Sequence, residues 1–256
     1  NSLEEASKNI DCVVHLAFLN GTKFFYSNPD LVLDIGVKGI LNIIDVCKKN
    51  KIPELILASS SEVYQLAKKI PTDEKVVCKI PDVLNPRYSY AGGKLISEII
   101  ALNNSNIFKR LLIFRPHNVY GPDMGYGHVI PQFIKRIQIK SNKYRKKIKF
   151  LIQGNGNETR SFNYIDDFVD GFLKILDKGR NKNIYNIGTQ DEIKILQLIQ
   201  KLVKISNKKL IIKKTKEKLG STPKRCPDIT KICKLGFKPK INLDVGLKKT
   251  FEWYSN

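Results

Sequence analysis

Two residues in the stretch from 86 to 98, PRYSYAGGKLISE, have types and a spacing that suit proton transfer. Tyr90 and Lys94 are four apart, so in a helix their side chains lie on one face, one turn from each other. An ammonium beside a phenol favours the phenolate and lowers a tyrosine pKa that starts near about 10, which makes the phenol usable as a general base. The pair alone also fits a surface helix on which the two side chains simply pack together, because short motifs match by chance.

A cluster of polar side chains lies upstream of this pair. The apolar run 55–58 indicates a buried strand, and it is followed closely by Ser60, Ser61 and Glu62. Ligands of open parallel sheets bind beyond the carboxyl ends of the strands. These three side chains are therefore candidates for the same site as the tyrosine and the lysine.

The same region belongs to a series of eight segments that extends along nearly the whole chain. They are DCVVHLAF at 11–18, GVKGILNIIDVC at 36–47, LILASSSEVY at 55–64, RYSYAGGK at 87–94, FRPHNVYGPDM at 114–124, ETRSFNYIDD at 158–167, NIYNIG at 183–188 and RCPDITK at 225–231. In this order they resemble the extended short-chain dehydrogenase/reductase family of NAD-dependent nucleotide-sugar epimerases and dehydratases.

The resemblance implies an α/β fold, a Rossmann-like doubly wound parallel sheet with a smaller substrate-binding lobe. Residues 1–120 would form a partial NAD-binding domain, and residues 121–256 mainly the substrate-binding lobe, with some segments returning to the sheet. The family's first strands and its G-x-x-G-x-x-G turn have no counterpart here, and Gly36 stands where the family usually has Asn. The chain thus resembles an N-terminally truncated member. We expect it to bind NAD poorly and to be inactive alone, because that turn supplies the backbone donors and helix dipole that hold the pyrophosphate.

The resemblance also implies catalytic roles for Ser60, Glu62, Tyr90 and Lys94. Tyr90 as phenolate would take the proton of the sugar C4 hydroxyl while C4 is oxidised by NAD. Lys94 would hold the phenolate and the nicotinamide ribose, and Ser60 would hydrogen-bond the C4 oxygen. The resulting 4-keto sugar is the intermediate from which epimerisation, dehydration or decarboxylation branches.

Glu62 bears on which branch follows. Relatives that only epimerise at C4 usually carry small or hydroxylic residues at the two places after the catalytic Ser or Thr. Sugar dehydratases carry Glu at the second place, where it takes the C5 proton, and UDP-glucuronate decarboxylases share the Ser-Glu form found at 61–62. The pattern favours dehydration or decarboxylation, with plain 4-epimerisation as the close alternative. The simpler alternative is that Glu62 points to solvent after the strand.

Further residues match family positions that bind cofactor or substrate. The cofactor positions are His15, Leu16, Ala17, Tyr90, Lys94 and Pro116, and the substrate positions are Ser60, Ser61, Asn118, Arg160 and Arg225. The two arginines match residues that bind the substrate diphosphate or ribose, and a guanidinium has the fork geometry that diphosphate recognition needs. Simpler interpretations stay open: a buried, satisfied histidine at position 15, and ordinary turn chemistry around position 118.

Two long helices are expected, at 29–50 and from 88 to about 107, because apolar residues recur there at helical spacing. In the family these helices pack against their copies in a second subunit. The resemblance therefore implies a homodimer through 30–50 and 88–107, although the apolar surfaces fit ordinary core nearly as well. The segment 66–86 has no periodicity and is expected to form a loop over the sugar site.

Three expectations concern the second half of the chain. Asp166 and Asp167 directly precede an apolar-periodic segment, which predicts that they cap a helix from 168 to 176. A second helix is expected from 191 to about 205. A last helix is expected over 243–254, with Trp253 packed inward.

Composition argues against several classes of function. A hydrophobic content of 42% and a charged content of 27% are typical of a soluble globular protein. No apolar run reaches the roughly 18 residues that a membrane span needs, and nothing at the N-terminus resembles a signal peptide. The five scattered cysteines form no C-x-x-C pair, which suits a reducing, cytoplasmic location. The three histidines show no metal-binding spacing, so no metal site is expected.

The net charge of +21 raises the question of nucleic-acid binding. Lysines are spread over the whole chain, however, which indicates a compositional bias rather than a basic surface made for a partner. The densest run, 135–149, is expected to be a solvated helix end and loop. A non-enzymatic, RNA-binding relative of the same fold remains the alternative, with the charge as its only support.

Overall fold

The fold is built on a four-stranded parallel sheet. The structure is a computed structural model that describes residues 2–143, 148–207, 210–215 and 222–255. The strands are β1 (Cys12–His15), β2 (Glu54–Ala58), β3 (Arg110–Pro116) and β8 (Asn183–Ile187), in the order β1-β2-β3-β8. The predicted α/β class with a parallel sheet is confirmed. Within the segment 11–18, strand β1 ends at His15, and the chain then runs without regular structure to Gly21.

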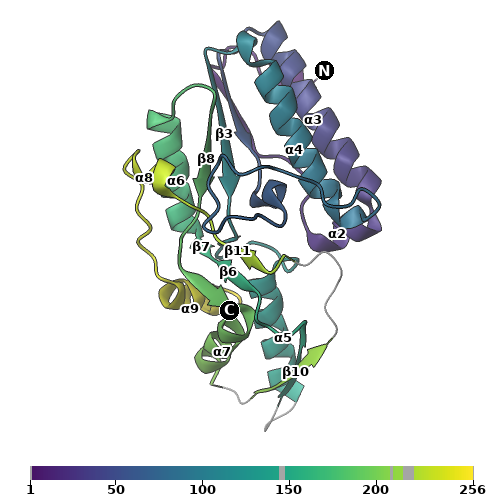
Figure 1. Cartoon of the computed structure of the whole chain (residues 1–256), viewed down its shortest axis with the longest axis vertical. Coiled ribbons are helices and arrows are strands. Elements are labelled where there is room, and N and C mark those ends of the chain that lie inside the picture. Colours follow the sequence, from purple (N-terminus) through teal and green to yellow (C-terminus); the bar gives the residue numbers. More distant parts are fainter. Residues whose placement is uncertain (1, 144–147, 208–209, 216–221, 256) are drawn as a thin grey trace.

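Both faces of β2 and β3 are buried, as continuous apolar strands predict for parallel sheets. Because successive side chains point to opposite faces, Leu55 and Leu57 of β2 pack on one side while Ile56 packs on the other. Helices α3 (Pro29–Lys49) and α4 (Ser89–Asn103) run side by side over the first face, and α6 (Ile165–Lys178) covers the second (Figure 1).

The two long helices follow the sequence pattern closely. Helix α3 begins with a proline at its first turn and ends with Lys48 and Lys49, which suits the proline preference and the dipole of a helix. Helix α4 is shorter than expected, because the backbone N–H of Asn104 bonds back to Ile100 and a 3₁₀ turn, η3 (Ser105–Ile107), follows. Two further short helices, α1 (Ser2–Ala6) and α2 (Thr22–Ser27), flank β1 in the chain.

A second lobe lies beyond the carboxyl ends of the strands (Figure 1). Its core is one apolar cluster to which α5 (Val129–Lys143), α7 (Ile195–Ile205) and α9 (Leu243–Trp253) contribute. Its short strands are β4 (Val119–Tyr120) with β7 (Asn163–Tyr164), β5 (Ile148–Gln153) with β10 (Leu210–Thr215), and β11 (Lys224–Arg225) with β6 (Thr159–Ser161) and β9 (Glu192–Lys194). Helix α8 (Thr230–Cys233) returns to pack beside α6 and β8.

Three local predictions for the second half of the chain are wrong. Asp167 does not cap α6; its carboxylate accepts hydrogen bonds from the backbone N–H groups of Lys240 and Ile241, 3.0 and 2.9 Å away. The helix expected from 191 begins only at Ile195, because the residues before it form β9 against β6. Trp253 is 46% exposed rather than packed inward.

Three further predictions concern the loop after Tyr64, the basic run 135–149 and membrane-spanning helices. No helix or strand interrupts residues 65–85, as expected for a loop. Within the basic run 135–149, residues 144–147 lie outside the described residues. In the part of the chain that the structure describes, no helix combines the length and the apolar character that crossing a membrane requires.

Candidate active site

One cavity, about 400 Å³ in volume, opens where the carboxyl ends of β2 and β3 meet the second lobe. Seven of the predicted site residues line it: Ser60, Ser61, Glu62, Tyr90, Pro116, Asn118 and Arg225. Another hollow, of about 500 Å³, lies between α7 and α9 and contains none of the predicted residues. The structure therefore brings together, around one space, side chains that are up to 165 positions apart in the sequence.

Tyr90 lies in the first turn of α4, after a 3₁₀ turn, η2 (Pro86–Tyr88), that Asn85 caps. Its ring stacks on Phe25 with the centroids 4.9 Å apart. Burial raises the pKa of Tyr90 to about 12; a hydrogen bond from Ser60 opposes this rise, and the charge of Glu62 adds to it. The sequence predicted a pKa lowered by Lys94, but in this structure burial outweighs any such effect.

Lys94 lies one turn further along α4, only 3% exposed. Its Nζ donates a hydrogen bond to the backbone oxygen of Ala58, 2.7 Å away at the end of β2. Burial lowers the pKa of Lys94 to about 7, against the charge of Glu98, which raises it. The ammonium lies 4.3 Å from the centroid of the Phe18 ring and 5.9 Å from that of Tyr90.

A buried ion pair supports this end of the site. Glu98, one turn beyond Lys94 on α4, accepts hydrogen bonds from Arg115 Nε at 2.8 Å and Nη2 at 2.5 Å, and another from the hydroxyl of Ser59. Arg115 also donates to the Tyr64 hydroxyl at 2.8 Å. Because Ser59 immediately precedes Ser60, the ion pair ties the loop after β2 to both α4 and β3.

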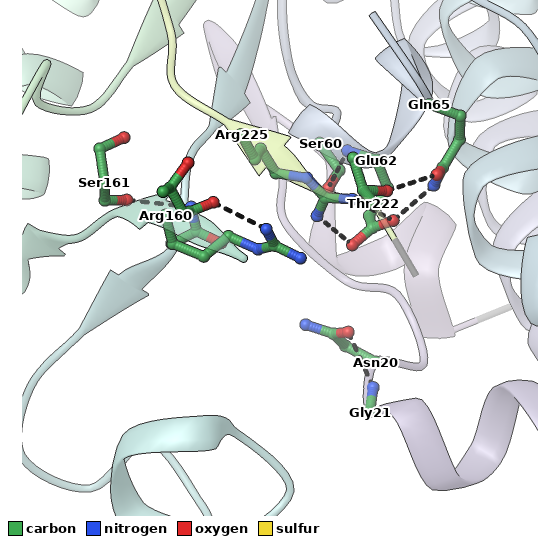
Figure 2. A network of polar contacts seen from close by, with 11 residues as sticks. Asn20, Gly21, Ser60, Glu62, Gln65, Arg160, Ser161, Thr222 and Arg225 are labelled. Atoms are coloured by element: carbon green, nitrogen blue, oxygen red, sulfur yellow. Dashed lines mark hydrogen bonds and ion pairs between the residues drawn. The ribbon is translucent and has the colours of Figure 1, made fainter. Parts of the chain in front are cut away.

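The loop after β2 is a 3₁₀ turn, η1 (Ser61–Tyr64), that Ser60 caps by accepting from the Glu62 backbone N–H at 3.2 Å. Glu62 does not point to solvent. Its carboxylate is bound by both terminal nitrogens of Arg225 and by Gln65 Nε2 at 2.6 Å (Figure 2). Burial would raise the pKa of Glu62, but the charge and hydrogen bonds of Arg225 dominate and lower it to about 2. The carboxylate is thus ionised and held in the wall of the cavity.

Arg160 lies beside Arg225, because β6 and β11 pair in parallel with these two residues in register. The one hydrogen bond of its guanidinium among the described residues is from Nη1 to the carbonyl of Thr159, at 2.7 Å. Burial and the charge of Arg225 lower the pKa of Arg160 to about 10. Figure 2 shows its side chain extending toward Arg225 and Glu62, although Arg160 is not among the residues that line the cavity. Two guanidiniums and one carboxylate leave a positive excess that suits an anionic ligand.

The other predicted site residues differ in how they lie relative to the cavity. Leu16 is 60% exposed, and neither Leu16 nor Ala17 lines the cavity. His15 is buried at the end of β1, and burial, with the nearby charge of Lys94, lowers its pKa to about 4. Asn118 adopts a left-handed backbone conformation (φ 39°) and donates from Nδ2 to the Ser161 carbonyl at 2.9 Å, which fixes its side chain at the cavity wall.

Sequence reasoning missed several residues around the site. Phe18 and Phe25 contact the Tyr90 ring from two sides. Glu98 lies four residues after Lys94, a spacing that would have placed it on the same helix face. Asn186, at the end of β8, accepts from the Tyr64 hydroxyl at 2.8 Å, and no local sequence signal indicates this contact.

The donor set suits the ribose of a dinucleotide cofactor. An ammonium has three N–H donors, and in the described part of the chain the Lys94 ammonium has a single hydrogen-bond acceptor, the Ala58 carbonyl. Two N–H donors of the Lys94 ammonium thus remain for the two hydroxyl groups of a ribose, next to the Tyr90 phenol. No group of three or more His, Cys, Asp or Glu side chains that could hold a metal ion occurs among the described residues.

A serine after the carboxyl end of a parallel strand and a tyrosine on the next long helix line one cavity, with a lysine one helical turn behind the tyrosine. This is the arrangement of an extended short-chain dehydrogenase/reductase. The chain belongs to the NAD dependent epimerase/dehydratase family, whose model matches residues 1–188. The family consists of NAD-dependent enzymes, so the resemblance of the eight sequence segments is confirmed.

Three similar proteins illustrate the range of the family. The chain is 30% identical over 268 residues to the UDP-N-acetyl-alpha-D-glucosaminuronate decarboxylase of Bacillus cytotoxicus, covering 99% of this chain and 79% of that one. It is 31% identical over 264 residues to the dTDP-D-glucose 4,6-dehydratase of Bos taurus, covering 97% of this chain and 68% of that one. A crystal structure of a mutant UDP-glucuronic acid 4-epimerase from Bacillus cereus, with UDP-4-deoxy-4-fluoro-glucuronic acid and NAD, matches with a TM-score of 0.87 and 26% identity over 100% of this chain and 78% of that one.

Proposed function

We propose that the site oxidises a nucleotide-linked sugar at C4, with Tyr90 as the base that takes the C4 hydroxyl proton. The observation that carries this proposal is the position of Tyr90 and Ser60 on one cavity, with Lys94 one helical turn behind the tyrosine. Ser60 would hydrogen-bond the C4 oxygen. The phenol must become a phenolate for this step, so its pKa of about 12 has to fall when cofactor and substrate fill the site.

The cofactor in this proposal is NAD, which when bound accepts the hydrogen and electron pair that C4 loses. Lys94 would hold the nicotinamide ribose with the two donors that Ala58 does not use. Pro116, which lines the cavity at the end of β3, would lie beside the nicotinamide. We assign the cofactor to the lobe formed mainly by residues 1–120, to which β8 also belongs, and the substrate mainly to the lobe formed by 121–256.

The substrate would be a nucleotide diphosphate sugar held by Arg160 and Arg225. The two guanidiniums lie side by side on paired strands, and each offers the bidentate geometry that phosphate oxygens need. Asn118 and Ser61 line the same cavity as Tyr90 and Arg225, and both would contact the sugar.

Incubating the full-length protein with NAD and a panel of sugar nucleotides, and following the products by mass spectrometry, tests this function. A product that differs from its substrate by configuration, by loss of water or by loss of carbon dioxide supports it. Absence of turnover on the whole panel, together with salt-sensitive RNA retention, would favour the non-enzymatic alternative.

Glu62 bears on the step after oxidation. We propose that it moves the C5 proton, which the 4-ketone makes acidic, so that the reaction continues to dehydration or decarboxylation; plain 4-epimerisation is the alternative. A carboxylate with a pKa of about 2 is a weak base. A substrate diphosphate that competes for Arg225 would release Glu62 and raise its pKa, because the arginine charge is what lowers it.

Replacing Glu62 with glutamine is expected to abolish deuterium incorporation at C5 when the true substrate turns over in deuterated water. Glutamine keeps the size of the side chain and a hydrogen bond to Arg225, but it cannot take a proton. Mass spectrometry of the recovered sugar nucleotide measures the label. An unchanged C4 reaction with no C5 label in either protein would contradict the proposed role.

We further propose a homodimer through α3 and α4. Several large apolar side chains on these adjacent helices are exposed, among them Leu41 at 45% and Ile99 at 46%. Changing Leu41 and Ile99 to glutamate is expected to convert a dimer into a monomer, as measured by sedimentation equilibrium. A wild type that is monomeric at micromolar concentration would refute the assignment.

We also propose a cytoplasmic location, which is consistent with the five free cysteines.

A further inference from the structure

The side chain of Phe18 occupies a notch between the two long helices. The notch exists because residues 36 and 93, which face each other across α3 and α4, are glycines. A Cβ atom built on Gly36 would lie 2.0 Å from Cζ of Phe18, and one built on Gly93 would lie 2.8 Å from the same atom. The absence of a side chain at Gly36 and the bulk of Phe18 thus fit each other sterically.

From this notch the ring covers the Tyr90–Lys94 pair. Its centroid lies 4.3 Å from the Lys94 ammonium, a cation–π distance, and its edge-to-face contact with the Tyr90 ring has a centroid separation of 5.2 Å. Lys94 is almost fully buried, although its ammonium has only one hydrogen-bond acceptor among the described residues. The Phe18 ring therefore covers a cation that retains unused donors.

Phe18 lies in a segment without regular secondary structure. Residues 16–21 form neither helix nor strand, and Leu16 and Ala17 on its N-terminal side are exposed. The phenyl ring has no polar group, so only its contacts in the notch hold it there. A rotation of this side chain toward solvent would open the notch without any change in the sheet or in the two helices.

We propose that Phe18 gates the catalytic pair: its ring must leave the Gly36–Gly93 notch before the ribose of a nicotinamide dinucleotide can hydrogen-bond Lys94. The inference rests on the proposed function, since it takes Lys94 as the ribose-binding group. Phe18 is then a positioning residue that acts through Lys94. The chain binds cofactor less tightly than the exposed pair would allow, because part of the binding energy is used to displace the ring.

Chemical modification of Lys94 tests the gate without cofactor. The full chain is treated with a small amine-reactive reagent, and the Lys94 peptide is quantified by mass spectrometry over time. Modification is expected to be severalfold faster in Phe18→Ala, which removes the ring, and in Gly36→Ala, whose Cβ would displace it. Gly39→Ala is the matched control, one turn along the same helix, because its Cβ would meet only the His15 ring, at 3.7 Å.

A second measurement uses NAD and the full-length protein, as in the activity assay, because the chain alone is expected to bind NAD poorly. Protection of Lys94 from the reagent by increasing NAD gives a dissociation constant for each protein, and Phe18→Ala is expected to bind about five- to tenfold more tightly than wild type, the ratio that loss of one cation–π contact corresponds to. Equal modification rates in wild type and Phe18→Ala, or weaker NAD binding in the variant, would overturn the gate. Equal NAD protection of both proteins would overturn the gate and leave the proposed function standing. If NAD protects neither protein, the ribose-binding role of Lys94 is lost and the gate with it. Circular dichroism confirms that each variant is folded, and Phe18→Leu replaces any variant that is not.

Discussion

Replacing Tyr90 with phenylalanine is expected to reduce turnover of the nucleotide sugar by a factor of about 10² to 10⁴, the usual contribution of a positioned general base. The change removes one oxygen and leaves the ring, so the stacking on Phe25 and the edge contact with Phe18 remain. Affinity for the sugar nucleotide should stay nearly unchanged, because the phenol acts on a proton and does not hold the diphosphate. Steady-state kinetics with the full-length protein and NAD, together with calorimetric titration of substrate, separates the two effects.

Arg160→Ala supplies the contrast. It removes charge-assisted hydrogen bonds to the diphosphate, which are worth roughly 1.5 to 3 kcal/mol each, so affinity is expected to fall about tenfold or more while turnover at saturation changes less. Arg160 suits this test better than Arg225, because Arg225 also holds Glu62. Normal turnover in Tyr90→Phe would remove the basis of the whole catalytic assignment.

The regular elements could be predicted because their signals are local. Apolar residues at helical spacing predicted α3 almost to the residue, and the apolar run 55–58 predicted the buried strand β2. The same local reasoning was wrong at Asp167 and at the start of α7. Asp167 binds backbone groups more than seventy positions away, and residues 192–194 pair with β6 instead of beginning the helix.

In the candidate site, too, features with local sequence signals could be predicted and features that depend on tertiary contacts could not. The i, i+4 spacing of Tyr90 and Lys94 places them on one helix without any tertiary information, and the strand end places Ser60. The pKa values could not be predicted, because burial rather than the neighbouring charge dominates both groups. The fit of Phe18 to Gly36 could not be predicted either, since it depends on how closely α3 approaches α4.

The contact between Glu98 and Arg115 is also long-range, and it leads to the largest expected effect on stability. Both side chains are 3% exposed. Changing Glu98 to glutamine leaves the Arg115 charge buried without a counter-charge, which is expected to lower the free energy of unfolding by about 3 to 5 kcal/mol. That loss is a large fraction of the roughly 5 to 15 kcal/mol typical of a folded domain. Urea denaturation followed by circular dichroism measures the change.

A second ion pair, which joins β2 to β3, provides the control. Glu54 of β2 and Arg110 of β3 are paired at 2.7 Å, but their side chains are 29% and 25% exposed. Glu54→Gln should therefore cost only about 0 to 1 kcal/mol, because water screens the unpaired arginine. The double variant Glu98→Met with Arg115→Met is expected to be more stable than Glu98→Gln, since it removes both charges and keeps the volume filled. If Glu98→Gln cost no more than Glu54→Gln, Arg115 would have to reach water in the folded protein, and the ion pair would not anchor the loop that carries Ser60.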